Sequence, residues 1–74
     1  MVWIKIEDGL PELYEDVILY CENIKGIPYK IGERYFAVDK LCKWLDDGSI
    51  SFRSERFDFA KPICWMPLPK HPED

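Results

Sequence analysis

Residues 16–22 read Asp-Val-Ile-Leu-Tyr-Cys-Glu, and this stretch decides the fold class. Five consecutive apolar, β-branched or aromatic side chains stand between acidic residues, a composition that favours a strand over a helix. A run that is apolar at every position indicates burial on both faces, which is typical of a central strand. We therefore expect residues 16–22 to form the middle of a sheet.

The chain before this stretch predicts one strand and one loop. Residues 1–6 alternate as a strand does, with Trp3 and Ile4 on opposite faces. Residues 7–15 break this alternation with an Asp-Gly turn signal and a proline. A proline can open a helical turn, so the loop is expected to hold a single turn over residues 11–14.

Four segments after the central stretch have strand-like patterns: residues 29–38 (interrupted by Gly32), 40–45, 49–53 and 62–66. Asp-Asp-Gly at positions 46–48 separates the second from the third and is typical of a tight hairpin turn. The alternative is a helix over residues 40–45 with Asp39 as its N-cap, and the adjoining turn argues against it. Residues 54–59 fit either a short strand or an extended packed loop.

The chain has 74 residues and is predicted to form one domain over residues 1–74, because it is too short to build two cores. We expect a mainly β fold: a small antiparallel sheet, curled or barrel-like, with at most one short helix. Aromatic residues make up 15% of the chain, and each one buried removes roughly 150–250 Å² from water. Trp3 and Trp65 are therefore predicted to be core anchors that pin the first and last strands together. Residues 70–74 are expected to be a frayed tail.

Charge and hydropathy argue against two classes of partner. The formal net charge is −4, whereas nonspecific affinity for nucleic acid comes mainly from Lys and Arg side chains. No apolar run approaches the ~20 residues of a membrane span, and the N-terminus lacks the pattern of a signal peptide. We expect a cytoplasmic protein with no nucleic-acid partner and no membrane contact.

The cysteines and the single histidine predict neither a metal site nor catalysis. Cys21, Cys42 and Cys64 stand isolated in apolar segments, whereas structural zinc ligands usually come in closely spaced pairs. An odd number of widely spaced cysteines is typical of reduced, buried thiols. His71 lies in the proline-rich tail, and the chain has no nucleophile elbow and no glycine-rich phosphate loop. We expect no metal, no cofactor, no catalytic residue and hence no enzyme.

Arginines beside aromatic residues are the strongest sign of ligand binding. Arg34 adjoins Tyr35, and Arg53 follows a phenylalanine. Such an arginine can stack on a ring and present its planar fork to a phosphate or carboxylate. We predict a ligand-binding set of Arg34, Tyr35, Trp44 and Arg53 for a small anionic or nucleotide ligand. The alternative is that these arginines shield sheet edges or pair with the many acidic residues.

Both ends of the chain carry motifs that resemble a known family. Trp3-Ile4 with Leu10-Pro11, and Trp65-Met66-Pro67-Leu68-Pro69 at the other end, resemble the opening W-I-x-V-x-[DE]-x-L-P and closing H-W-M-P-L-P patterns of a family of short phage and prophage proteins, a domain of unknown function. The chain departs from the closing pattern at Cys64, where the family usually has histidine.

This resemblance implies an accessory protein of a phage or prophage that acts in the bacterial host cytosol. We expect a counter-defence binding protein, a sponge that sequesters a host-made nucleotide immune signal, and we expect it to be a homo-oligomer. The alternative is a protein–protein inhibitor or adaptor that acts on a host defence protein through an acidic surface.

Overall fold

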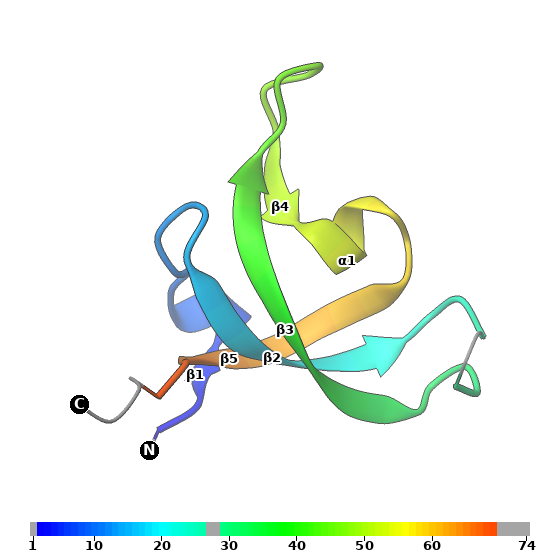
Figure 1. Ribbon diagram of the computed structural model, residues 1–74. Helices are drawn as coiled ribbons and strands as arrows, with labels where there is room; N and C mark the ends of the chain where they lie inside the picture. The colour runs from blue at the N-terminus through cyan, green and yellow to red at the C-terminus, as the bar shows by residue number, and fades with distance from the viewer. Residues whose placement is uncertain (1, 27–28, 70–74) are drawn as a thin grey trace, which may run out of the picture.

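The computed structural model describes residues 2–26 and 29–69, which form one curled antiparallel sheet (Figure 1). Its strands are β1 (Ile4–Lys5), β2 (Asp16–Asn23), β3 (Arg34–Lys43), β4 (Ile50–Phe52) and β5 (Ala60–Pro67), and they lie side by side in the order β1-β5-β2-β3-β4. A 3-10 turn, η1 (Ile6–Asp8), follows β1, and a short helix, α1 (Arg53–Arg56), follows β4. The predicted mainly β, curled antiparallel fold is confirmed.

β2 is the central strand, as its sequence predicts. It pairs with β5 on one side and with β3 on the other. Val17, Leu19 and Cys21 are completely buried, while the residues between them are half-buried. The core lies on this inner, concave face of the sheet, and Leu41, Phe52, Ala60 and Trp65 complete it.

The first segment departs from its prediction. β1 has only two residues, and the chain then enters η1, so the expected strand over residues 1–6 ends early. The helical turn lies at η1 and not over residues 11–14. Tyr14 has a left-handed φ of 64° and donates its backbone N–H to the Leu41 carbonyl at 2.7 Å, so the loop bonds to β3 where a helical turn would bond to itself.

β3 joins two segments that the sequence separates. The predicted strands over residues 29–38 and 40–45 are one strand, which begins only after a turn at Gly32. The helical alternative for residues 39–45 is therefore wrong for the residues that β3 includes. Residues 54–59 form neither the expected strand nor an extended loop, because α1 and a turn occupy them. The Asp39 carboxylate stabilises that helix from β3, and this partner is distant in sequence.

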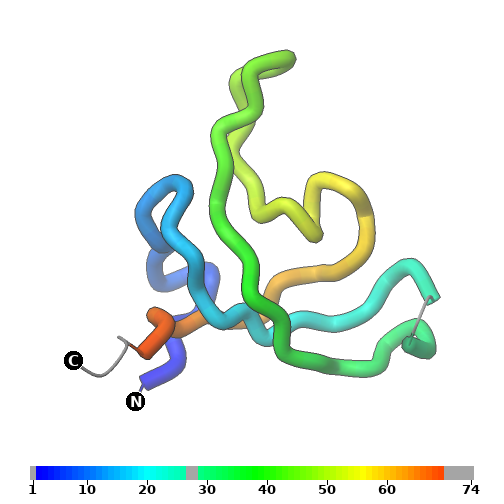
Figure 2. Tube along the Cα trace, viewed as in Figure 1, coloured from blue at the N-terminus to red at the C-terminus, as the bar shows by residue number. Residues whose placement is uncertain are grey.

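The predicted hairpin is confirmed. β3 and β4 pair antiparallel around residues 44–49, and the Trp44 N–H donates to the Ser49 carbonyl at 2.8 Å. Gly48 has a φ of 75°, a left-handed conformation that glycine adopts at low cost. Figure 2 shows this hairpin projecting from the rest of the sheet.

The tryptophans near the two ends have different environments. β1 pairs with β5 and sets Ile4 opposite Trp65, so the first and last strands adjoin as predicted. Trp65 is buried, and its Nε1–H donates to the Gly9 carbonyl at 3.0 Å. Trp3 is not a core anchor: it is 38% exposed on the outer face, because its neighbour Ile4 takes the inward position of the pleat.

Two further predictions concern membrane contact and the C-terminal tail. No helix among them is long and apolar enough to cross a membrane. The predicted frayed tail over residues 70–74, which includes His71, lies outside the described residues.

Candidate functional site

The outer face of the sheet carries a cluster of exposed aromatic rings. The strand registers align Cys64 on β5, Tyr20 on β2 and Phe36 on β3 in one row, and Trp3 adjoins that row. The Trp3 and Phe36 rings are stacked, with centroids 5.7 Å apart and an interplanar angle of 22°. Tyr20 lies against both at a tilt, 5.1 Å from Phe36 and 6.1 Å from Trp3. We call the three rings of Trp3, Tyr20 and Phe36, together with the adjoining Cys64, the aromatic platform.

The aromatic platform is open to solvent. Phe36 is 65% exposed, and its strand neighbour Val38 is 64% exposed. The platform borders a shallow depression of about 270 Å³, in which the Cys64 thiol is half-buried. Burial raises the pKa of this thiol above its ordinary value, so the group stays neutral near pH 7. A contiguous apolar surface of this kind commonly marks a binding site.

Basic side chains surround the aromatic platform. The strand residues of the outer face include four bases and two acids: Lys5, Arg34, Lys40, Lys61, Asp16 and Glu22. Arg34 pairs with Glu22 at 3.8 Å, and Lys40 pairs with Asp16 at 3.5 Å; Arg34 and Asp16 are exposed, and their partners are half-buried. Four bases against two acids give this face a charge of +2, so the rest of the −4 chain carries −6. The outer face is thus locally positive on an acidic protein.

The four residues predicted to bind a ligand do not line one surface. Arg34 is on the outer face, two residues from Phe36 and next to the aromatic platform. Tyr35 points to the inner face, where it packs against the core and stacks on Tyr29 at 4.8 Å between centroids. Burial, together with contacts to Cys21, raises the pKa of Tyr35 to about 12. Tyr35 therefore has a packing role, and Arg34 alone adjoins the platform.

Trp44 belongs to a cluster at the base of the hairpin. Its Nε1–H donates to the Ser51 hydroxyl at 2.9 Å, and the Arg56 guanidinium lies 5.0 Å from the centre of its ring. Arg56 also pairs with Asp46 and, at 2.8 Å, with Asp47. These interactions bind the hairpin to α1 and occupy the charged groups, so the cluster reads as structural.

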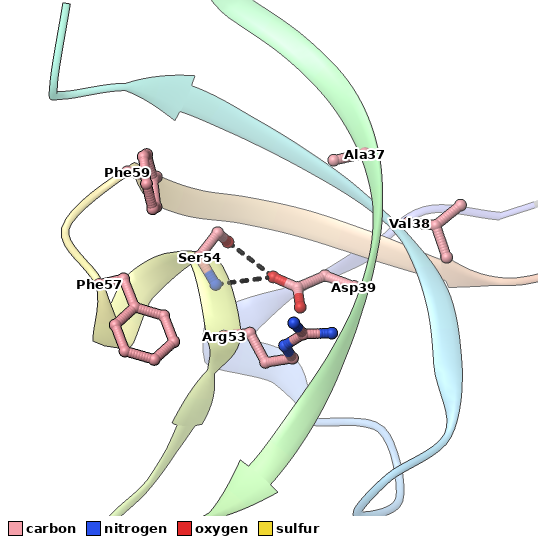
Figure 3. A pocket seen from close by; sticks show the side chains of 7 residues that line it. All are labelled: Ala37, Val38, Asp39, Arg53, Ser54, Phe57 and Phe59. Carbon is pink, nitrogen blue, oxygen red and sulfur yellow. Dashed lines mark hydrogen bonds between the residues drawn. The ribbon is translucent and has the colours of Figure 1, made fainter. Parts of the chain in front are cut away.

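Arg53 lines a separate groove between β3 and α1, shown in Figure 3. This β3 groove has a volume of about 280 Å³ and is lined by Ala37, Val38, Asp39, Arg53, Ser54, Phe57 and Phe59. Asp39 is buried at its base, and its carboxylate accepts hydrogen bonds from the Ser54 N–H at 3.0 Å and the Ser54 hydroxyl at 2.6 Å. It also accepts the Lys40 N–H at 2.7 Å. Asp39 thus acts as a cap for α1 supplied by another element.

Trp3, Tyr20 and Phe36 are site residues that the sequence did not predict. Period-two alternation places Tyr20 on one face of its strand and Phe36 on one face of another. Whether those faces coincide depends on the strand register, which the sequence alone does not contain. Trp3 was assigned to the core instead.

Comparison with known proteins identifies a family and no function. A family model described as "Protein of unknown function (DUF551)" matches residues 2–73. No curated protein and no solved structure matches the chain. The resemblance to a domain-of-unknown-function family is therefore confirmed at the level of the family.

Proposed function

Since the chain belongs to the DUF551 family, whose function is unknown, we propose a function from the surface of the molecule itself. We propose that the protein is a binding protein that captures an anionic ligand with a planar ring, such as a nucleotide, on the aromatic platform. The observation that carries this proposal is the exposed Trp3–Phe36 stack on a face rimmed with basic residues.

Stacking supplies the affinity in this proposal. A base that stacks on an aromatic side chain contributes about 1–3 kcal/mol, and it does so independently of base identity. Phe36 offers the larger exposed ring surface, and Arg34 and Lys5 lie beside the platform within the same face. An arginine fork suits a phosphate group. The ligand is thus expected to place its ring over Phe36 and its phosphate toward Arg34.

We extend the proposal to the setting that the terminal motifs imply. The protein would be a phage or prophage accessory protein that sequesters a host nucleotide immune signal in the bacterial cytosol. Such a sponge needs a binding surface and no chemistry. The platform is open on one side, so one copy covers only one face of a ligand. A homo-oligomer in which a second copy covers the other face would bind more tightly.

Calorimetry with a panel of cyclic nucleotides, ADP-ribose derivatives and mononucleotides tests this proposal. At least one member should bind, and Phe36→Ala should weaken that binding by about tenfold, since one stacked base is removed. Phe57→Ala is the matched control, because Phe57 is similarly exposed and lies away from the platform. No binding across the panel, or equal losses in both variants, would rule the proposal out.

A second candidate function rests on the loop before β2. Residues 6–15 contain four exposed acids and no base: Glu7, Asp8, Glu12 and Glu15. Leu10 and Tyr14 in the same loop are more than half exposed. This surface suits an inhibitor or adaptor that covers a basic surface of a host defence protein. A pull-down from host lysate should recover a partner that a Glu12→Lys/Glu15→Lys double variant loses. Equal recovery by both would contradict this candidate.

A further inference from the structure

β3 has one open edge. Along the side facing β2, residues 34–40 are paired, whereas on the other side β4 covers only residues 41–43. Residues 34–40 therefore have a second edge with no strand beside it in the described part of the chain. Such an edge presents unpaired backbone donors and acceptors, which are a template for another strand.

The hydrogen bonds at the two ends of β3 identify the residues that face this edge. In an antiparallel pair, alternate residues direct both backbone groups to the same neighbour. The Asn23 N–H donates to the Glu33 carbonyl at 2.8 Å, so the odd-numbered residues of β3 bond toward β2. On the opposite side of β3 the Trp44 N–H donates to the Ser49 carbonyl at 2.8 Å. The even-numbered residues of β3 therefore direct their backbone groups toward β4, and toward the open edge where β4 is absent.

Arg34, Phe36 and Val38 therefore direct their backbone groups to the open edge. Lys40 is also even-numbered, but its N–H donates to the Asp39 carboxylate. The row of unpaired backbone groups along the open edge therefore ends at Lys40. Figure 3 shows the Val38 side chain pointing away from the β3 groove, so Val38 borders the groove with its backbone. The open edge and the β3 groove are thus one continuous surface.

The far wall of the β3 groove is aromatic and flanked by positive charge. Phe57 and Phe59 are 54% and 42% exposed. The Arg53 side chain lines one end, where no ion pair within 4.0 Å holds it among the described residues. The Lys25 ammonium lies 4.2 Å from the centre of the Phe59 ring. The one carboxylate that lines the groove, Asp39, is occupied by its bonds to backbone and serine donors.

We propose that the open edge of β3 and the β3 groove form a docking site for an extended, apolar and acidic peptide segment of a partner protein. The open backbone row requires a strand, which would pair with about five residues of the peptide. An alternate apolar side chain packs against Phe57 and Phe59, and an acidic side chain pairs with Arg53. This site uses the backbone groups of Phe36 and the side chains of the groove, whereas the aromatic platform uses the Phe36 ring on the outer face.

A second copy of the chain fits this site less well. Its β3 would have to place inner-face side chains in the groove, and Tyr35, Ala37 and Asp39 are those side chains. Tyr35 packs against its own core, and Asp39 caps its own helix. A free peptide has no such prior contacts.

Fluorescence anisotropy with a labelled, amidated Thr-Val-Thr-Val-Asp peptide tests the proposal. The matched control peptide carries N-methylated valines, which cannot pair with a strand, and it should bind at least tenfold more weakly. Replacing the peptide's Asp by Asn should cost about tenfold with the natural protein and almost nothing with Arg53→Gln, because the two changes remove the same pair. Lys43→Gln is the control variant, since Lys43 is exposed on the part of β3 that β4 covers and does not line the β3 groove. Equal affinity for the plain and the N-methylated peptides, or equal losses of affinity with Arg53→Gln and Lys43→Gln, would overturn the proposal.

Amide hydrogen exchange measures the protection of the backbone N–H groups at the open edge directly, without any substitution. In the free protein the Phe36 and Val38 amides should exchange rapidly, while those of Tyr35 and Ala37 are protected by β2. Saturating peptide should protect the first pair at least tenfold. If Phe36 and Val38 are already protected in a protein that light scattering shows to be dimeric, a second copy occupies the edge and the proposal is wrong. No added protection at saturation also overturns it.

Discussion

Removal of the Asp39 carboxylate tests whether this buried acid is structural. Asp39 accepts two hydrogen bonds from Ser54, which is the second residue of α1, and one from the adjacent Lys40 N–H. In Asp39→Ala, the Ser54 N–H and hydroxyl would lose their acceptor at a site that excludes most water. The Lys40 N–H lies at the open edge of the sheet and can donate its hydrogen bond to water instead.

The cost follows from the Ser54 bonds alone. Hydrogen bonds to a charged group contribute about 1.5–3 kcal/mol each, and loss of a helix cap costs about 0.5–2 kcal/mol. These terms overlap, so Asp39→Ala should lower the free energy of unfolding by about 2–4 kcal/mol. A chain of 74 residues has a total of about 4–11 kcal/mol at 0.05–0.15 kcal/mol per residue. The substitution therefore removes a large share of the stability.

Urea denaturation followed by tryptophan fluorescence measures this loss. With a slope of about 1 kcal/mol per molar urea, the midpoint should fall by about 2 M or more. Ser54→Ala, which removes only the hydroxyl bond, should cost about 1 kcal/mol. Asp16→Ala is the control, since its exposed pair with Lys40 is expected to contribute less than ~1 kcal/mol. If Asp39→Ala costs no more than Asp16→Ala, the capping role is refuted.

Two other predictions concern the closure of the sheet and the hairpin. Trp65→Phe removes the donor to the Gly9 carbonyl and should lower the free energy of unfolding by about 1–2 kcal/mol in urea denaturation; an unchanged midpoint would contradict the role assigned to that bond. Hydrogen bonds from Ser49, followed by those from Arg56, lower the pKa of Asp47 to about 2. The contribution of Asp47 to stability is therefore present above its ordinary pKa of 3.8 and is lost as the pH falls toward 2. An NMR titration should show a higher Asp47 pKa in Ser49→Ala and also in Arg56→Ala, and an unchanged Asp47 pKa in Ser49→Ala would be inconsistent with this assignment.

Local patterns predicted the parts of the fold that local interactions decide. The run from Val17 to Cys21 is apolar at every position, and this composition marks the central strand, although only its inner-facing residues are completely buried and its outer-facing residues are half-buried. The hairpin turn needs a left-handed residue, and Gly48 supplies it within the turn itself. The pairing of the first and last strands was predicted from Trp3 and Trp65 as core anchors, and the pairing is confirmed, but Ile4 takes the core position expected of Trp3.

Long-range partners decided the parts that the sequence did not predict. α1 is a single helical turn, too short to be stable alone, and its cap comes from Asp39 on another strand. The site was missed for a related reason. Tyr20 and Phe36 meet only because β2 and β3 pair in one particular register, and Trp3 joins them from the segment just before β1. A shift of one residue would have turned Phe36 to the opposite face.

The most direct test of the central claim is an NMR titration of isotope-labelled protein with the nucleotide that binds best by calorimetry. If the aromatic platform is the binding surface, the ring resonances of Trp3, Tyr20 and Phe36 should shift together, and the Arg34 side chain should shift with them. Resonances of the β3 groove should stay in place. Binding that shifts the β3 groove or the hairpin, and leaves the three rings unchanged, would contradict the account.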